Sequence, residues 1–198
     1  MLKKYLFIIL FLLFGFLVLV ISVLRSASLR HSANFNTPFS KGYLPEEKLS
    51  VDYFFASAGK VLPDSPLWGI KVARDKFWLF LTPGLTRKSE LNLLLSDKRL
   101  VAAKILIEKG KYSLAYETIL KSHNYFINAI NLEAEARKRG NNTDELLLLL
   151  NKASLAHKEV IENLKSVLPD EIFSRLVSVI NELESFYYES SIILKDKK

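Results

Sequence analysis

Residues 86–110 read TRKSELNLLLSDKRLVAAKILIEKG, and the spacing of their apolar residues decides the fold class. Apolar side chains recur at intervals of three and four residues, which is the period of one face of an α-helix. The members of this repeat are Leu91, Leu94, Leu95, Val101, Ala102 and Ile105. Gly110 follows them, and glycine is common just past a helix C-terminus. The sequence therefore predicts a helix here, with one side toward a core and most of its charges on the other side.

An earlier helix is predicted over residues 66–81, before the break at Thr82-Pro83-Gly84. In the preceding turn, the side chain of Asp64 or Ser65 is expected to accept a free amide hydrogen of the first helical turn. Pro66 suits the first helical position, where no N–H donor is needed. The apolar spacing predicts a core-facing stripe, and its members are Ile70, Ala73, Phe77, Phe80 and Leu81.

Three more helices are predicted over 111–139, from residue 144, and from 169–171 toward the C-terminus. Charges that suit the helix dipole and glycines that end helices mark their limits. The apolar stripe of the first comprises Tyr116, Ile119, Leu120, Phe126, Ile127 and Ile130. That of the second comprises Leu146, Leu149, Leu150, Ala153, Ala156, Val160, Ile161 and Leu164. That of the third comprises Phe173, Leu176, Val177, Ile180, Leu183 and Tyr187. Because short connections make neighbouring helices antiparallel, residues 61–198 are expected to form an all-α, left-handed antiparallel bundle of four to five helices.

The segment 5–24, YLFIILFLLFGFLVLVISVL, contains no charged residue. As a helix it would be about 30 Å long, which matches the hydrocarbon core of a bilayer. The alternative is a cleaved signal peptide, with Lys3 and Lys4 before the apolar run and Ser26-Ala27-Ser28 after it. Signal peptides have shorter apolar regions of about 7–15 residues, which favours an uncleaved anchor. We therefore expect 1–24 to be a short cytoplasmic tail followed by one transmembrane helix.

Charges flank this anchor on both sides, so charge counting leaves its orientation open. We expect the N-terminus inside, because long domains cross membranes largely regardless of charge. Residues 25–60 are expected to be a linker: the part up to about residue 50 is rich in Ser, Asn, Pro and Gly, and 51–60 are a candidate short helix. In that stretch, Tyr53, Phe54 and Phe55 are either anchors at the membrane interface or ordinary core residues.

A resemblance to a known family begins at the turn Leu62-Pro63-Asp64-Ser65-Pro66-Leu67. The matching residues continue through 68–71, 76–77, 81–82, 88–91 and 98–100. Together they resemble an uncharacterised bacterial family of membrane-anchored or secreted proteins, whose helical domain of unknown function opens with such a turn. The resemblance covers about residues 60–135. It implies an extracytoplasmic helical domain in a bacterium, and it implies no reaction.

The residues suggest no catalytic, cofactor or metal site. The absence of cysteine excludes disulfides, thiolate nucleophiles and cysteine metal sites. The sequence lacks a nucleophile elbow and a phosphate-binding glycine loop. His123 and His157 fall on apolar stripes, but Leu120 and Ser154 stand where a carboxylate-bridged bundle site would need Glu. We therefore expect both histidines to be core or boundary residues, and the protein not to be an enzyme.

Basic charge is concentrated in the first half of the predicted bundle. Residues 60–121 contain 12 Lys and Arg against 6 acids, whereas residues 122–198 contain 10 against 12. One interpretation is a surface that binds a polyanion, such as anionic lipid or a cell-wall polymer; its candidate residues are Lys71, Arg74, Arg87, Lys88, Lys98, Arg99 and Lys104. The other interpretation is a solvated face that keeps the domain soluble, because acids are interspersed among the bases.

The function that the sequence favours is a non-catalytic interaction module, anchored in a bacterial cytoplasmic membrane with its C-terminal domain outside. Its expected partner is an envelope protein, bound at exposed aromatic residues among Trp68, Trp78, Tyr187 and Tyr188. The alternative is the polyanion binder. No nucleic-acid recognition motif is present, so nucleic acid is not expected as a partner.

Overall fold

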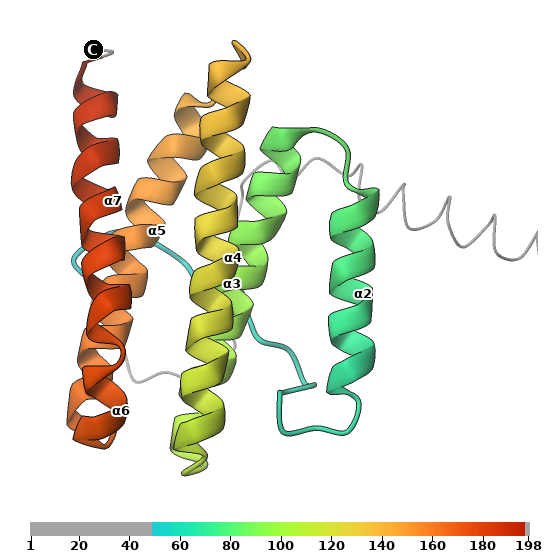
Figure 1. Cartoon of the computed structure of the whole chain (residues 1–198), viewed down its shortest axis with the longest axis vertical. Coiled ribbons are helices and arrows are strands. Elements are labelled where there is room, and N and C mark those ends of the chain that lie inside the picture. Colours follow the sequence, from blue (N-terminus) through green and yellow to red (C-terminus); the bar gives the residue numbers. More distant parts are fainter. Residues whose placement is uncertain (1–48, 197–198) are drawn as a thin grey trace, which may run out of the picture. The chain divides into compact units, whose positions relative to one another are not determined.

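A computed structural model of the chain describes residues 49–196, which are entirely helical or irregular and contain no strand. The predicted anchor and most of the predicted linker lie outside the described residues. The elements are α2 (Trp68–Leu81), α3 (Leu85–Glu108), α4 (Tyr112–Lys138), α5 (Asp144–Asn163), the 3₁₀ turn η1 (Leu164–Ser166), α6 (Asp170–Ser174) and α7 (Val177–Lys195) (Figure 1). The all-α prediction is therefore confirmed for this part of the chain. Within residues 49–196, no helix combines the length and apolarity needed to cross a bilayer.

The bundle is built mainly from two helix pairs, since α3 packs chiefly on α4, and α5 packs chiefly on α7. The return of α4 alongside α3 is antiparallel, as the short connection predicts (Figure 1). One cluster of buried side chains, including Leu106, Phe126, Leu150 and Leu183, joins all four helices. The predicted stripe of α5 is largely buried, so this part of the sequence pattern is confirmed.

Helix α3 is enclosed by more of the fold than its periodicity predicts. It contacts α2, α4 and α5. As a result, the expected apolar positions Leu95, Val101 and Ala102 are buried, but Asp97, Arg99 and Lys104 are buried too. The prediction that its charges lie on a solvent-facing side is therefore wrong for these three residues. Because several elements surround this helix, its charged side chains find polar partners inside the domain: Arg99 pairs with Asp75, and Asp97 with His157.

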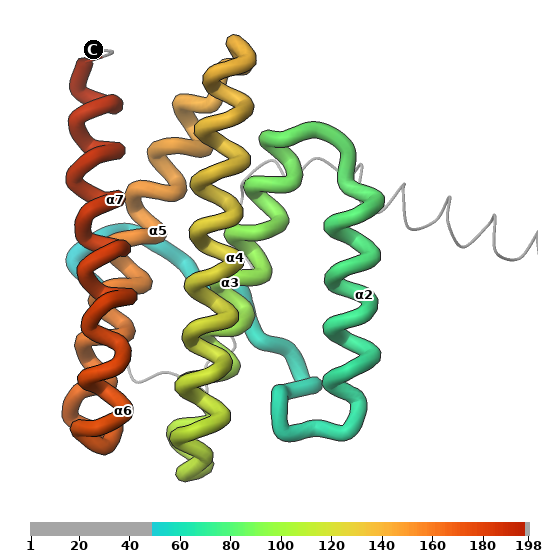
Figure 2. The backbone as a smooth tube through the Cα atoms, in the orientation of Figure 1, coloured from blue at the N-terminus to red at the C-terminus, as the bar shows by residue number. Residues whose placement is uncertain are grey.

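Residues 51–60 are extended instead of forming a short helix. Tyr53, Phe55, Ala58 and Leu62 from this segment belong to the buried cluster, whereas Phe54 is exposed. Alternation between buried and exposed neighbours is the pattern of an extended chain lying on a surface. Figure 2 shows this stretch in cyan, passing from the region of α5 and α7 toward the start of α2. The described end of the predicted linker is therefore part of the folded domain, and Tyr53 and Phe55 are core residues.

The apolar spacing of α2 predicts which of its faces packs on the bundle, and in the structure the opposite face does so. Ile70, Phe77 and Phe80 are 70%, 48% and 79% exposed, while Asp75 is buried. The predicted core-facing stripe of this helix is therefore wrong. The face turned to the bundle carries Asp75, which pairs with Arg99 of α3, together with the partly buried Trp68 and Val72.

Two helix limits also differ from the expected ones. α2 begins two residues after Pro66, because the Ser65 hydroxyl accepts the N–H of Leu67 in a preceding turn and Asp64 pairs with Lys109 and Lys111. The expected last helix is divided into α6 and α7, with Leu176 fully buried at the junction.

Candidate functional site

The centre of the candidate site is a buried ion pair between α2 and α3. Arg99 Nη2 donates to Asp75 Oδ2 at 2.8 Å, and the side chains are 2% and 4% exposed. Arg74 Nη2 donates to the other carboxylate oxygen of Asp75 at 2.8 Å from the solvent side. A single carboxylate therefore accepts hydrogen bonds from two guanidinium groups, one of them inside the domain.

The structure brings part of the predicted polyanion set together around this carboxylate. Lys71, Arg74, Lys98 and Arg99 surround Asp75 closely enough for their charges to interact. Arg87 and Lys88 lie instead in the first turn of α3, and Lys104 is buried farther along that helix. The seven residues thus do not form one exposed surface, and the cluster around Asp75 is the part with a defined geometry.

The lysines of this cluster are affected by burial and by their neighbours. Lys71 Nζ donates to the carbonyl oxygens of Ala58 and Val61 at 2.6 and 2.7 Å, which ties the extended segment to α2. Burial, and next the nearby Arg99 charge, lower the pKa of Lys71 to about 8. Burial also lowers the pKa of Lys98, against the opposing effect of Asp75. Both lowered pKa values fit a site in which cations outnumber acids.

A pocket of about 320 Å³ opens beside the ion pair, between α2 and α4, with Arg99 of α3 in its wall. The Arg99 Cζ lies 4.3 Å from the ring centroid of Trp68 and 5.9 Å from that of Tyr125. Arg99 Nη1 is buried and has no hydrogen-bond partner. The remaining polar side chains of the lining are Lys76, Lys121, Asn124 and Asn128. The sequence predicts Trp68 only as an aromatic residue at a protein interface, and its patterns do not select Tyr125 or these polar residues. They come from α2 and α4, so only the folded domain places them around Arg99.

A family model for a domain of unknown function, DUF5667, matches residues 60–171 of this chain. The chain belongs to the DUF5667 family. This confirms the resemblance to an uncharacterised family of helical domains. No match was found among curated proteins or among solved structures. The DUF5667 match includes α2 to α5, and therefore the Asp75–Arg99 pair and its pocket.

The outer face of α2 is a second feature within the DUF5667 match. We call Ile70, Ala73, Phe77 and Phe80 the α2 stripe; all four are exposed. At about 100° per residue, these side chains occupy one face of the helix, with Arg74 on one flank and Lys76 on the other. The opposite face carries Trp68, Val72 and Asp75 toward the bundle. The α2 stripe is therefore an apolar face that is turned outward.

His157 of the DUF5667 region lies in a buried network that joins three parts of the fold. Its Nε2 is 2.8 Å from Asp97 Oδ1, and Tyr53 Oη donates to both oxygens of Asp97 at 3.0 Å. Burial, followed by the Asp97 charge, raises the pKa of Tyr53 well above its ordinary value. Since all three side chains are buried, the network holds the extended segment against α3 and α5 and is poorly placed for a reaction with a ligand.

His123 is the other histidine predicted to be a core or boundary residue. Its Nε2 lies 2.8 Å from the Glu182 carboxylate on α7. The two histidines thus have different acidic partners and do not form one site. Within residues 49–196, no group of three or more acidic or histidine side chains has metal-binding geometry. Among the four aromatic residues expected at an interface, Tyr188 is exposed, and Trp68, Trp78 and Tyr187 are partly buried.

Proposed function

We propose that this protein is a non-catalytic interaction module held by residues 5–24 on the outer side of a bacterial cytoplasmic membrane. In this proposal, α2 is the docking element, and its partner is the anionic surface of the bilayer. The observation that carries the proposal is the outward-facing α2 stripe. Ile70, Phe77 and Phe80 each leave about half or more of their surface in water, which is unfavourable unless another surface covers them.

The chemistry of the helix favours a membrane surface as that cover. An interfacial helix buries an apolar face at the boundary between head groups and acyl chains, while basic residues beside that face contact anionic lipid. The α2 stripe supplies isoleucine and phenylalanine for the apolar part. Arg74 is 57% exposed on one flank, and Lys76 is exposed on the other. This charge complementarity favours lipid over an uncharged protein groove.

The order of elements along the chain supports the same partner. The predicted anchor ends at Leu24, and residues 25–67 connect it to α2. A protein that is tethered to a membrane meets that surface at a high effective concentration, so a weakly binding helix can dock on it. A protein partner in the envelope is the competing occupant of the α2 stripe, and the experiment below separates the two.

The proposal is tested with residues 49–198, which exclude the anchor, mixed with vesicles of phosphatidylglycerol and phosphatidylcholine. We expect cosedimentation that increases with the phosphatidylglycerol fraction. The double variant Ile70→Asp/Phe77→Asp should lose it, because two charges would enter the apolar boundary. Ile192→Asp is a matched control, since Ile192 is a 60% exposed isoleucine on α7. Circular dichroism verifies that each variant is folded.

Absence of vesicle binding by the folded fragment, or equal binding by the double variant, would contradict lipid docking. If the double variant instead loses a protein captured by the full chain in cells, while vesicle binding is absent, the α2 stripe is a protein interface. Loss of binding in the Ile192→Asp control would show that any added negative charge repels the vesicles, which would also contradict a specific role for α2.

A further inference from the structure

The pocket beside Arg99 has the properties of a binding site for a small anion. It lies against the bundle-facing side of α2, which carries Trp68, Val72 and Lys76 to its wall, and α4 forms the other side. Its volume of about 320 Å³ falls at the lower end of the range for small-molecule pockets. The inference does not rest on the membrane docking proposed above, because the α2 stripe lies on the opposite face of the helix.

Arg99 has a buried guanidinium nitrogen without a hydrogen-bond partner. Nη2 donates to Asp75, whereas Nη1 is buried without an acceptor. A buried donor without a partner is unfavourable, and such groups are rare in folded proteins. The Trp68 and Tyr125 rings contact the flat faces of the guanidinium, so a ligand would approach along its edge. The edge at Nη1 is what remains for an oxygen atom from a ligand.

The charges of the residues that line the pocket indicate the charge of the ligand. Arg99, Lys76 and Lys121 line the pocket, and no acidic residue does. Asp75 lies behind Arg99 and is already shared between two arginines. The Asn124 and Asn128 amides add neutral donors and acceptors at the same wall. Several cations around one vacant donor suit a doubly charged group better than a single carboxylate.

We propose that this pocket binds the phosphate monoester of a small molecule, with Arg99 Nη1 donating to a phosphate oxygen and with Lys76 and Lys121 neutralising its charge. Two sources share this chemistry: a soluble phosphorylated compound, and the head group of a lipid such as phosphatidic acid. Asn124 and Asn128 are placed to bind hydroxyl groups on the organic part of the phosphorylated molecule. Trp68 makes the site observable, because its indole ring lies over Arg99 and changes its surroundings when the pocket fills.

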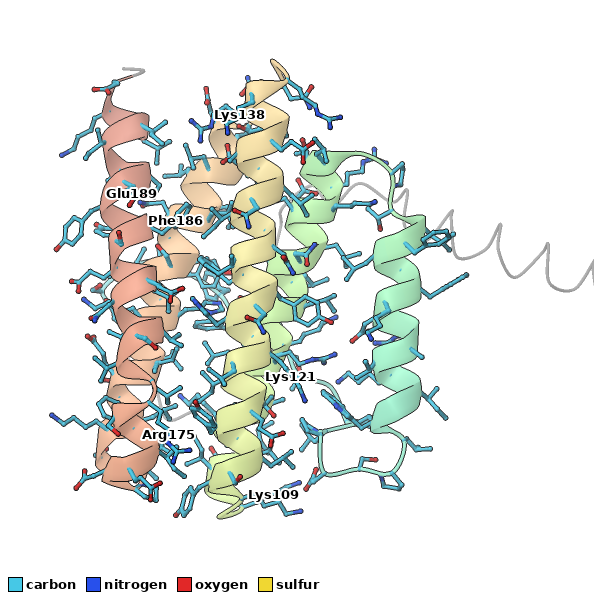
Figure 3. The ribbon with its side chains drawn as sticks, in the orientation of Figure 1. Lys109, Lys121, Lys138, Arg175, Phe186 and Glu189 are labelled. Atoms are coloured by element: carbon cyan, nitrogen blue, oxygen red, sulfur yellow. The ribbon has the colours of Figure 1, made fainter. Side chains whose placement is uncertain are left out.

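Lys121 and Lys138 provide a matched pair of variants for the test, because both are exposed lysines on α4 and lie far apart along it (Figure 3). The full chain in uncharged detergent micelles is titrated with inorganic phosphate and with glycerol 3-phosphate, followed by calorimetry and tryptophan fluorescence. We expect saturable binding, weakened about fivefold to tenfold by Lys121→Gln through loss of one charged contact. Lys138→Gln should leave the affinity unchanged.

A second arm distinguishes the sources. The full chain is placed in phosphatidylcholine vesicles with or without phosphatidic acid, and glycerol 3-phosphate is added. If phosphatidic acid competes with glycerol 3-phosphate in the parent chain and not in Lys121→Gln, the ligand group comes from lipid. If soluble phosphate binds and phosphatidic acid does not compete, the ligand is a soluble compound.

Three outcomes would overturn the inference. The first is the absence of saturable binding to either phosphate probe by the folded chain. The second is equal weakening by Lys121→Gln and Lys138→Gln, which would indicate general attraction to a basic surface. The third is binding that leaves Trp68 fluorescence unchanged, with Trp78→Phe used to isolate the Trp68 signal. Because none of these measurements involves the α2 stripe, failure here and failure of membrane docking are distinguishable.

Discussion

Arg99 Nη2 and Asp75 Oδ2 lie 2.8 Å apart, and both side chains are almost completely buried between α3 and α2. Helix α2 otherwise contacts the bundle over a short length, chiefly through α3. The pair requires the Asp75 face of α2 to be turned toward α3. It also orients the guanidinium toward the pocket and leaves the α2 stripe facing outward.

Removing the carboxylate from this pair should destabilise the domain strongly. Asp75→Asn leaves the Arg99 charge buried without its acidic partner, which is expected to cost about 3–5 kcal/mol of unfolding free energy. Urea denaturation measures this change. Asp64→Asn is the control, because Asp64 forms its ion pairs with Lys109 and Lys111 near the surface, where screening makes such pairs weak. Equal destabilisation by the two variants would contradict the special role of the buried pair.

Phenylalanines of α2 and α4 should respond very differently to truncation. Phe80 is 79% exposed and Phe126 is fully buried. Phe80→Ala is expected to change the free energy of unfolding by less than about 0.5 kcal/mol, whereas Phe126→Ala should cost about 3–5 kcal/mol. Chemical denaturation of the two variants checks this. A large loss of stability for Phe80→Ala would contradict the outward orientation of α2.

Tyr53 should make the domain less stable at alkaline pH. Burial and the Asp97 charge raise the pKa of Tyr53 well above its ordinary 10.0. Between the two pKa values, the folded protein keeps a proton that the unfolded chain loses. Stability should therefore fall as pH rises above about 10, by about 1.4 kcal/mol per pH unit from this group. Denaturation midpoints between pH 9 and pH 11 measure the slope, and Tyr53→Phe should reduce it. An unchanged slope in that variant would assign the effect to other groups.

The extended segment before α2 should be necessary for the stability of the bundle. A chain that begins at residue 49 retains Tyr53, Phe55, Ala58 and Leu62 in the core, whereas one that begins at residue 63 lacks them. Loss of this apolar burial is expected to cost on the order of 5 kcal/mol. Thermal and urea denaturation of the two fragments compare their stabilities. Similar stabilities would mean that residues 49–62 lie on the domain without contributing to its core.

The sequence predicts the helical architecture well where apolar spacing and packing agree. In α5, Leu146, Leu150, Ala153 and Ile161 follow the helical period, and all are buried as expected. In α2 the same reasoning selects Ile70, Phe77 and Phe80, which are exposed. Periodicity identifies the apolar face of a helix but does not reveal what covers that face. The pairing of Asp75 with Arg99 joins two helices, so a search for local patterns misses it.

The candidate site was only partly predictable for a related reason. An excess of basic residues in the first half of the bundle selected Lys71, Arg74, Lys98 and Arg99, which the fold brings together around Asp75. It also included Arg87, Lys88 and Lys104, which lie elsewhere. The sequence predicts Trp68 at a protein interface and does not select Tyr125, because their position over Arg99 depends on tertiary packing. The vacant Nη1 likewise has no counterpart in a sequence pattern.

The most direct test of the central claim is the depth of α2 in a membrane. Because the chain has no cysteine, Phe80→Cys and Ile192→Cys each create a single site for a nitroxide label. The full chain is reconstituted in phosphatidylglycerol-containing vesicles, and collisions of the label with oxygen and with a water-soluble nickel complex give its depth. Membrane docking through α2 predicts that the label at position 80 lies about 5–10 Å inside the interface, while the label at 192 stays in water. Equal exposure of both labels to the nickel complex would contradict it.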